Sequence, residues 1–555
     1  MKVIRIRITI TAALPYAKGP LHLVHIRSTY LPADIYARYQ RLAGNDAVYI
    51  CASDEHGTPI VAAAEKEKKT PAEFVDYYHE KDKSEFEKLG FSMDIFHRTS
   101  SEENREMAQH FFLKLNERGL IYEKEVEQAY CGRCGRFLPD RFVIGKCPYC
   151  SATGQYSDYC DACGKALSAG ELIEPRCSSC GSPPTAKKSR HYFFKLSQLS
   201  PKLEQWLRGN KELQHEVVNY LLNWIKEGLK DWDISRDMEW GVPIPSDKGK
   251  VLYVWFDAPI GYVSSTVAWA KLKGKSWEDY WKRDCRIVHF IGKDIVYHHY
   301  LFWPAMLMEV GEGFKPPDAI PTRGYLNLEG RKFSKSKNWF VSLEDYLSAF
   351  PADYLRYYVT TITPHSVQDA DFYWKDFQDR INNELVACIG NFIHRTLVLI
   401  NKSSSSQIPK PVQLDGTEEK LLQLISQSKQ SVGKRIDSFD FKGGLEEINA
   451  LASEFNKYLS EREPWKERDK QKLGNCLYVC SRAVTALGVL LYPYLPFSSE
   501  RLLSQLGVSE KITWEHVDKE LLPPGKKIAA AKPLFEKVSD ESIKKQEEKL
   551  RHPQR

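Results

Sequence analysis

The sequence predicts an α/β protein in which a parallel sheet carries a cysteine-rich insertion and is followed by an all-α region. Strand-like, helix-like and strand-like patterns succeed one another over residues 3–53, as at the start of a parallel α/β domain. Eight of the 13 cysteines fall between residues 131 and 180. From about residue 373 to 535 nearly every segment has helical periodicity. A chain of 555 residues is too long for one core, so we expect about three or four units.

The N-terminal part alternates between strand and helix patterns. Residues 3–12 alternate Ile with Arg or Thr, which predicts a strand. A loop with two prolines and a glycine follows, and a helix is predicted over residues 21–42 because a proline precedes it and a glycine follows it. DAVYICAS at 46–53 predicts a second strand. The α/β pattern returns near residue 250 with KVLYVWFDAPIGY and CRIVHFIGKDIVYHHYLFWPAML, the latter being a strand, a glycine turn and a helix.

The C-terminal part is predicted to be helical, with one interruption. NKSSSSQIPKP at 401–411 breaks the helical pattern. The last twenty residues are rich in charge, and we expect them to form a frayed tail.

The composition is that of an ordinary globular protein. Apolar residues make up 42% of the chain and charged residues 27%. No apolar run approaches the roughly 20 residues that a membrane helix needs, and the N-terminus lacks an apolar signal core. We therefore expect a cytoplasmic protein with no membrane partner. The net charge of +6 permits a nucleic-acid partner without requiring one.

The clustered cysteines form four C-x-x-C pairs, the spacing typical of zinc knuckles. In a chain with no sign of secretion this spacing favours a metal over disulfides or redox chemistry. The pairs could be nested, with one site inside the other, or sequential, so one or two Zn²⁺ ions are expected. With only cysteine ligands and no open position, such sites would be structural. The predicted ligands are Cys131, Cys134, Cys147, Cys150, Cys160, Cys163, Cys177 and Cys180.

Two short motifs could handle phosphate groups. His22 and His25 lie three apart in the first turn of the predicted helix, whose N-terminus favours anions. Far downstream, Lys332, Ser334, Lys335 and Ser336 form a loop that could close on phosphates. Taken separately, the first motif could be two surface histidines, and the second could be an ordinary solvated loop.

Taken together, the motifs resemble those of class I aminoacyl-tRNA synthetases. HLVH at 22–25 is similar to the HIGH motif, and KFSKS at 332–336 is similar to KMSKS. The fuller resemblance is to the methionyl-tRNA synthetase family and covers nearly the whole chain. It is carried by AALPYAKGPLHLVH, ICASDEHGTPI, FLPDRFVIGKCPYC, YVWFDAPIGY, HFIGKDIVYHHYLFWPAML and RKFSKSK.

The resemblance implies a Rossmann-type catalytic domain and a two-step reaction. Methionine would attack the α-phosphate of ATP to give methionyl-adenylate and pyrophosphate, and tRNA(Met) would then accept the methionyl group. The implied partners are L-methionine, tRNA(Met) and ATP, the last bound with Mg²⁺.

The resemblance also assigns expected roles to individual residues. His22 and His25 would stabilise the phosphate transition state, and Lys332 and Lys335, flanked by Ser334 and Ser336, would close over pyrophosphate. Gly292 and Asp294 would bind the ribose, and Asp54 would hold the substrate ammonium. The remaining methionine-binding residues would be Ala13, Leu14, Tyr16, Trp255, Pro259, Tyr262, Ile295 and His299. Tyr262 and His299 could hydrogen-bond the methionine sulfur.

In the helical region, Asn391, Arg395 and Trp465 match the residues that read the anticodon. An indole, an amide and a guanidinium suit the recognition of unstacked bases. The expected catalytic domain has two halves, residues 1–118 and 232–325. Between them lies a connective insertion, 119–231, with zinc knuckles at about 128–186. The catalytic domain is followed by a junction bearing KFSKS at 326–372, a helical anticodon-binding domain at 373–535 and a charged tail at 536–555.

The sequence departs from the family pattern at two positions. Val24 stands where the HIGH motif has glycine, and Lys18 stands where asparagine is usual. Val24 could weaken ATP binding or mark a non-catalytic tRNA-binding paralogue. Another class I synthetase is disfavoured, because about 110 inserted residues leave no room for a large editing domain. No C-terminal domain of OB type is visible, so we expect a monomer.

Overall fold

The structure is a computed structural model that describes residues 5–157, 160, 162–163, 171–282, 284–333 and 339–551. A five-stranded sheet with the order β15-β14-β1-β2-β3 forms the centre of the first domain, and every paired strand in it is parallel. Its strands are β1 (Arg7–Ala12), β2 (Asp46–Ser53), β3 (Ile95–Arg98), β14 (Cys285–Gly292) and β15 (Thr322–Arg323). The chain order reverses at β1, which has β2 on one side and β14 on the other. The carboxyl ends of β1 and β14 therefore mark the switch point, where ligands bind in sheets of this type.

The first strand–helix–strand unit is close to its prediction. β1 begins at Arg7 instead of residue 3, and β2 coincides with the predicted strand 46–53. Ile8, Thr9, Ile10 and Thr11 are all buried, because both faces of the sheet are covered. The helix predicted over 21–42 begins at residue 23 and contains a π-helical turn. It runs as α1 (Leu23–His25), η1 (Ile26–Tyr30) and α2 (Leu31–Leu42).

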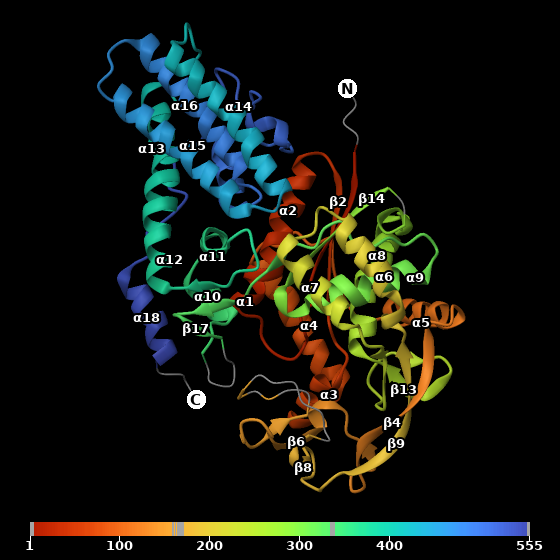
Figure 1. Ribbon diagram of the computed structural model, residues 1–555. Helices are drawn as coiled ribbons and strands as arrows, with labels where there is room; N and C mark the ends of the chain where they lie inside the picture. Colours follow the sequence, from red (N-terminus) through yellow and green to blue (C-terminus); the bar gives the residue numbers. More distant parts are fainter. Residues whose placement is uncertain are drawn as a thin grey trace.

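Further helices pack around the sheet (Figure 1). They are α3 (Thr58–Lys66), α4 (Pro71–Lys88), α5 (Glu102–Glu117), α8 (Val254–Lys273), η4 (Glu278–Tyr280), η5 (Lys293–Ile295), η6 (His298–Phe302) and α9 (Trp303–Val310). The strand–turn–helix predicted over CRIVHFIGKDIVYHHYLFWPAML is confirmed as β14, η5, η6 and α9.

The cysteine-rich insertion extends from the sheet domain on a long antiparallel ribbon, at the end of the molecule remote from the helical bundle (Figure 1). One sheet, in the order β10-β9-β4-β5, joins β4 (Ile121–Cys131), β5 (Arg136–Phe137), β9 (Thr185–Phe194) and β10 (Trp232–Asp233). The tip contains η2 (Asp140–Phe142), β6 (Val143–Lys146), β7 (Gln155–Tyr156) and β8 (Ile173–Cys177). Among the described residues of the tip, the cluster of buried apolar residues has six members, two of them cysteines. So small a core agrees with the expectation that metal ligation stabilises this segment.

The chain returns to the sheet domain through a short 3₁₀ helix, two α-helices and a small sheet. These are η3 (Leu196–Leu199), α6 (Ser200–Gly209), α7 (His215–Glu227), β11 (Ser235–Arg236), β12 (Pro243–Ile244) and β13 (Asp247–Leu252). A junction follows β15, in which a hairpin is completed by a parallel strand from further along the chain. It comprises β16 (Leu326–Leu328), β17 (Arg331–Lys332), α10 (Leu343–Ala349), α11 (Ala352–Thr361) and β18 (Ala370–Phe372).

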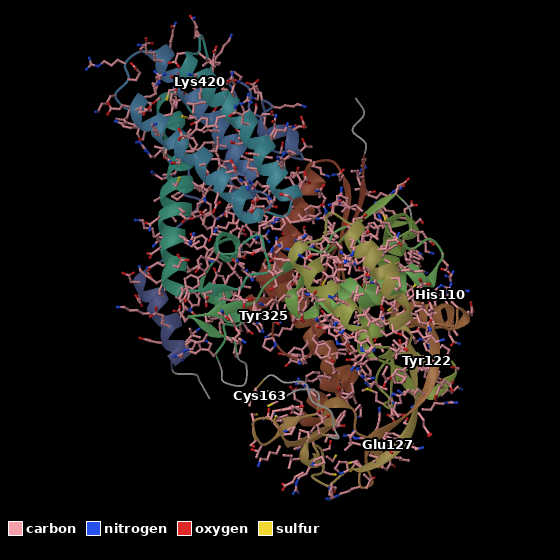
Figure 2. All side chains as sticks on the ribbon, in the orientation of Figure 1. His110, Tyr122, Glu127, Cys163, Tyr325 and Lys420 are labelled. Carbon is pink, nitrogen blue, oxygen red and sulfur yellow. The ribbon has the colours of Figure 1, made fainter. Side chains whose placement is uncertain are left out.

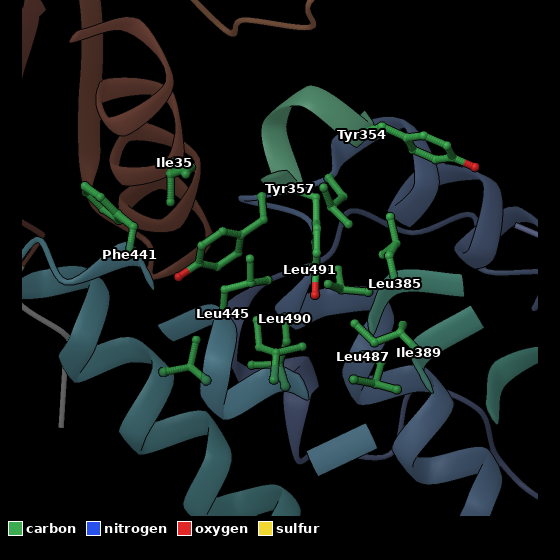
Figure 3. Close-up of a cluster of buried hydrophobic side chains, with 14 of the residues drawn as sticks. Ile35, Tyr354, Tyr357, Leu385, Ile389, Phe441, Leu445, Leu487, Leu490 and Leu491 are labelled. Atoms are coloured by element: carbon green, nitrogen blue, oxygen red, sulfur yellow. The ribbon is translucent and has the colours of Figure 1, made fainter. Parts of the chain in front are cut away.

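The C-terminal region is a helical bundle, as predicted. One long helix made of α12 (Trp374–Arg380), η7 (Ile381–Gly390) and α13 (Asn391–Ser403) leads into it from the junction (Figure 1). The other members are α14 (Gly416–Asp437), α15 (Phe441–Arg462), α16 (Lys470–Leu490), α17 (Pro496–Gln505) and η8 (Trp514–Val517). Figure 3 shows Ile35 of α2, Tyr357 of α11 and Leu445 of α15 in one buried cluster. The bundle, the junction and the sheet domain therefore share a continuous apolar core.

Two C-terminal helices bear on sequence expectations. α16 is long and apolar enough to cross a membrane, but 83% of its apolar window is buried within the structure, as in the core helix of a bundle. Residues 540–551 form α18 (Asp540–Arg551), which packs against α12. Gln378 Nε2 of α12 donates to Asp540 Oδ1 at 2.7 Å, and Ile543 and Leu550 are buried. The expectation of a frayed tail is therefore wrong for this segment, because its few apolar residues share one helix face.

Candidate active site, cysteine clusters and anticodon surface

A cavity of about 980 Å³ opens at the carboxyl ends of β1 and β14. All nine residues expected to bind methionine line it: Ala13, Leu14, Tyr16, Asp54, Trp255, Pro259, Tyr262, Ile295 and His299. His25, Gly292 and Asp294 line it as well, and so do the two departures from the family pattern, Lys18 and Val24. The fold thus gathers residues from five separate segments around one volume.

The two motif histidines form a stacked pair. The ring centroids of His22 and His25 lie 3.9 Å apart with planes inclined by 23°. The Phe333 ring, from the lysine-containing loop, stacks on the outer face of His22 at 5.5 Å. Lys332 is exposed at the end of β17, and Ser334, Lys335 and Ser336 lie outside the described residues. The structure therefore brings the start of the second motif against the first.

Asp54 offers a buried carboxylate to the cavity. It follows β2 and is fixed through its backbone, whose N–H donates to Pro15 O at 2.8 Å and whose carbonyl accepts from Ala17 N at 2.9 Å. Its Oδ1 atom is buried and has no hydrogen-bond partner among the described residues. Burial and the nearby Asp257 carboxylate raise the pKa of Asp54 well above its ordinary value. A ligand cation would relieve this desolvation.

Tyr262 and His299 are hydrogen-bonded to each other at the bottom of the cavity. His299 Nδ1 lies 3.2 Å from Ile295 O, so Nδ1 carries the proton and donates to that carbonyl. His299 Nε2 then accepts from the Tyr262 hydroxyl at 2.9 Å. Burial lowers the pKa of His299 to about 4, which keeps the ring neutral. The sequence suggests that both groups could hydrogen-bond the methionine sulfur, and the structure shows the Tyr262 hydroxyl proton engaged by the His299 imidazole.

An aromatic stack forms another wall, and the sequence reasoning missed most of it. The Trp255 ring lies 3.8 Å from His298, and the other face of His298 stacks on Trp232 at 5.0 Å. Two arginines also reach the cavity, Arg141 from the cysteine-rich insertion and Arg236 from β11. Arg141 and His298 occur within stretches that carry the family resemblance, and this was the one sign in the sequence that they could belong to the site. Spacing alone does not reveal that they meet.

The turn at Gly292 and Asp294 is compact. A Cβ atom at Gly292 would lie 2.5 Å from Asp294 Oδ1, so only glycine fits while the carboxylate keeps this position. Figure 2 labels Tyr325, which lies on the junction where it borders the sheet domain and also lines the cavity. The Lys293 ammonium sits over the Tyr325 ring, 4.6 Å from its centroid. Cationic and aromatic groups thus meet at the edge of the site.

The eight cysteines form two nested clusters, which decides between the two arrangements left open by the sequence. The outer cluster contains Cys131, Cys134, Cys177 and Cys180, and the inner one contains Cys147, Cys150, Cys160 and Cys163. Closest sulfur pairs lie 3.4 and 3.9 Å apart in the outer cluster and 3.5 and 3.9 Å apart in the inner one. A tetrahedral ion with Zn–S bonds of about 2.3 Å needs sulfur–sulfur edges of about 3.8 Å. Each cluster therefore fits one zinc ion.

In the helical bundle, two of the three expected anticodon residues touch. The Arg395 guanidinium lies 5.1 Å from the centroid of the Trp465 ring, which is 48% exposed. Asn391 begins α13 one helical turn before Arg395 and is also exposed. An exposed indole with a cation against it is a suitable stacking platform for a base.

This fold and site are those of a class I aminoacyl-tRNA synthetase. The family model described as "tRNA synthetases class I (M)" matches residues 8–397, and "Anticodon binding domain of methionyl tRNA ligase" matches residues 408–554. The methionine–tRNA ligase of Methanobrevibacter smithii is 46% identical over 548 residues, which cover 98% of this chain and 82% of that one. The Pyrococcus furiosus ligase is 44% identical and aligns with 97% and 76% of the two chains. The chain belongs to the methionine–tRNA ligase family.

Solved structures agree with this assignment. A Mycobacterium tuberculosis methionyl-tRNA synthetase bound by methionyl-adenylate has the same fold, with a TM-score of 0.80 and 24% identity over 96% of this chain and all of that one. A second structure of that enzyme with methionyl-adenylate has 25% identity and the same TM-score.

Proposed function

We propose that the cavity binds methionine with its ammonium against Asp54 and its side chain between Tyr16, Trp255 and Ile295. The observation that carries this proposal is the buried Asp54 carboxylate, whose Oδ1 lacks a hydrogen-bond partner among the described residues. A buried charge of this kind is costly unless an opposite charge joins it. The aromatic and aliphatic walls suit a thioether, which makes favourable contacts with ring edges.

In the first step, a methionine carboxylate oxygen attacks the α-phosphorus of ATP, and the bond to pyrophosphate breaks. ATP enters as its Mg²⁺ complex. His22 and His25 donate hydrogen bonds to the α-phosphate oxygens as negative charge develops. Lys332 and Lys335, with the flanking Ser334 and Ser336, close over the leaving pyrophosphate and neutralise its charge. Gly292 and Asp294 hold the ribose. In the second step, the terminal adenosine hydroxyl of tRNA attacks the methionyl carbonyl and AMP leaves.

Amino-acid-dependent ATP–pyrophosphate exchange tests this proposal. We expect exchange with methionine and not with other aliphatic amino acids. The same assay on Val24→Gly tests the departure in the histidine motif. Val24 lines the cavity beside His25, and its extra side chain is expected to cost ATP binding about 1–3 kcal/mol.

We therefore expect Val24→Gly to lower the KM for ATP about tenfold, with the methionine KM unchanged. An unchanged ATP KM would show that the adenine does not meet Val24. Exchange by the glycine variant alone would favour a second candidate, a tRNA-binding paralogue whose catalysis Val24 has switched off.

Metal analysis tests the cysteine clusters. We expect two zinc ions per chain, both structural, because each cluster supplies four thiolates and leaves no ligand position open. Cys147→Ser should retain one ion, and a strong chelator should unfold the insertion while leaving the helical bundle folded. The buried Cys51, which belongs to neither cluster, gives the matched control Cys51→Ser, which should keep both ions. Two ions retained in Cys147→Ser would contradict the assignment.

The proposed anticodon surface is tested with Trp465→Ala. Loss of one base-stacking platform is expected to cost about 1–3 kcal/mol, so the KM for tRNA should rise about tenfold or more. Pyrophosphate exchange, which needs no tRNA, should not change. Tyr373→Ala is a matched control, since Tyr373 is a similarly exposed aromatic (41%) at the start of α12. An equal rise in both variants would argue against a specific anticodon contact.

These assignments give the units their proposed roles. Residues 1–118 and 232–325 form the catalytic domain, 326–372 carry the lysine loop, and 373–535 read the anticodon. We further propose that the chain acts as a monomer in the cytoplasm, which a mass measurement in solution tests.

A further inference from the structure

Arg27 links the histidine motif to the junction. It lies in η1, two residues after His25, and its side chain is fully buried. The guanidinium donates from Nη1 to Gly324 O at 2.5 Å and to Tyr325 O at 3.2 Å. Nη2 donates to Gln368 O at 3.1 Å, and Nε donates to the Thr363 hydroxyl at 3.3 Å. One side chain thus holds three separate segments of the junction.

All of these acceptors are neutral. Among the described residues, no carboxylate lies within ion-pair distance of Arg27, and burial lowers its pKa to about 10. Arg356, another buried arginine, instead pairs with Asp34 at 2.7 Å. Burying a guanidinium without a carboxylate partner costs desolvation free energy, and an apolar side chain would fill the same space without that cost. What the guanidinium adds is a rigid planar fork that fixes the positions of several acceptors at once.

The segments that Arg27 holds are the roots of the lysine hairpin. Gly324 and Tyr325 lead directly into β16, which pairs with β17 and so carries Lys332. Gln368 leads into β18, the parallel neighbour of β16. A Cβ atom at Gly324 would overlap the Gln368 carbonyl, so the two segments are in close contact at this point.

A second set of contacts ties the same roots to the ribose turn. Asp369 Oδ1 accepts from Tyr325 N at 2.7 Å and from Lys293 Nζ at 2.6 Å. Lys293 precedes Asp294 in the turn proposed to bind ribose. Arg27 and Asp369 therefore fix the roots of the lysine hairpin relative to the histidine motif and the ribose turn of the sheet domain.

We propose that Arg27 is a positioning residue for adenylate formation, which sets the distance between the histidine pair and the lysine hairpin. The proposal rests on the proposed function of those two motifs. Misplacement of catalytic groups by about 1 Å can cost about a hundredfold in rate. Arg27 itself does not line the cavity, so we assign it a positioning role and not a catalytic one.

The test compares Arg27→Met, Arg27→Lys and Arg323→Met in pyrophosphate exchange. Arg323 is a matched control because it is also buried and also donates to backbone carbonyls, those of Thr322 and Phe439, the latter in the bundle. We expect Arg27→Met to lower kcat at least 100-fold with the methionine KM changed less than twofold. Arg27→Lys keeps the charge but loses the fork, and should lose more than tenfold. Arg323→Met should lower thermal stability comparably while changing kcat less than threefold.

Hydrogen exchange gives a readout that does not depend on activity. In Arg27→Met, the amides of 324–328 and 370–372 should exchange more than tenfold faster than in the natural chain. If Arg27→Met fails to fold, Arg27→Lys should show a weaker increase at the same amides. In Arg323→Met these amides should not exchange faster. Unchanged amides, or equal losses of kcat in the Met variants of Arg27 and Arg323, would overturn the proposal. If the natural chain shows no methionine-dependent exchange, the proposed function fails, and hydrogen exchange still decides whether Arg27 holds the hairpin.

Discussion

The Asp54→Asn variant should lose about a thousandfold in kcat/KM for methionine, most of it in KM. Asp54 is 6% exposed, and removing one partner of a buried hydrogen-bonded charge pair costs about 2–5 kcal/mol. Asparagine has nearly the same shape, so the cavity should keep its form. Methionine-dependent exchange over a range of methionine concentrations measures the effect.

The control uses a ligand instead of a second protein. An analogue of methionine that lacks the amino group should bind the natural enzyme much more weakly than methionine does. In Asp54→Asn this difference in affinity between the two ligands should be smaller. The natural enzyme and the variant should therefore differ in their ratio of affinities for the two ligands. An unchanged ratio would place the ammonium elsewhere.

The same residue predicts a pH dependence for methionine binding. Burial and the nearby Asp257 raise the pKa of Asp54, so the carboxyl group stays protonated to a higher pH than an ordinary aspartate. Only the ionised form attracts an ammonium, so methionine binding should strengthen as pH rises through that pKa. The dependence should disappear in Asp54→Asn.

The second large effect is expected for His25→Ala. Removing one preorganised donor to a developing oxyanion typically lowers kcat by about 10²–10³. We expect His25→Ala to lower the rate of pyrophosphate exchange by this factor. Methionine binding at equilibrium should not change, because His25 belongs to the histidine motif and is not among the residues proposed to bind the amino acid. Single-turnover adenylate formation gives the rate, and tryptophan fluorescence gives the binding.

His110→Ala is the matched control for His25→Ala. His110 lies on α5, ion-paired with Glu312 at 3.1 Å, and does not line the cavity (Figure 2). Its variant should retain full exchange activity. A loss of only a few-fold in His25→Ala would assign phosphate stabilisation to other donors.

Much of the fold could be predicted where local pattern and burial agree. Residues 47–52 of DAVYICAS are apolar without interruption, as in a strand covered on both faces, and β2 has the predicted bounds. Helix periodicity predicted the bundle, because helices such as α14 and α15 bury one apolar face. The π-helical turn at residues 26–30 was not predicted, and Arg27 within it bonds Gly324, which is 297 residues away and out of reach of local pattern. The tail was misjudged for a related reason, because its helix is stabilised by α12.

The candidate site also has a part that the sequence predicted and a part that it did not. The motifs identified His22, His25, Asp54 and the cysteines from residue type and spacing alone, or through the family that these residues resemble. Residues without a motif, such as Trp232 and Arg27, were not found, because their surroundings come from distant parts of the chain.

The sequence by itself determined the class of domain, the motifs and the number of cysteine pairs, since residue type, period and spacing are local properties. Only the tertiary structure decided how the cysteines pair, that Tyr262 bonds His299, and that the Phe333 ring rests on His22. Each of these depends on atoms that are far apart along the chain and that only the packing of several elements brings together. Strand pairing in the insertion illustrates the point: β6 aligns Val143 with Cys177, and the nested clusters follow from that register.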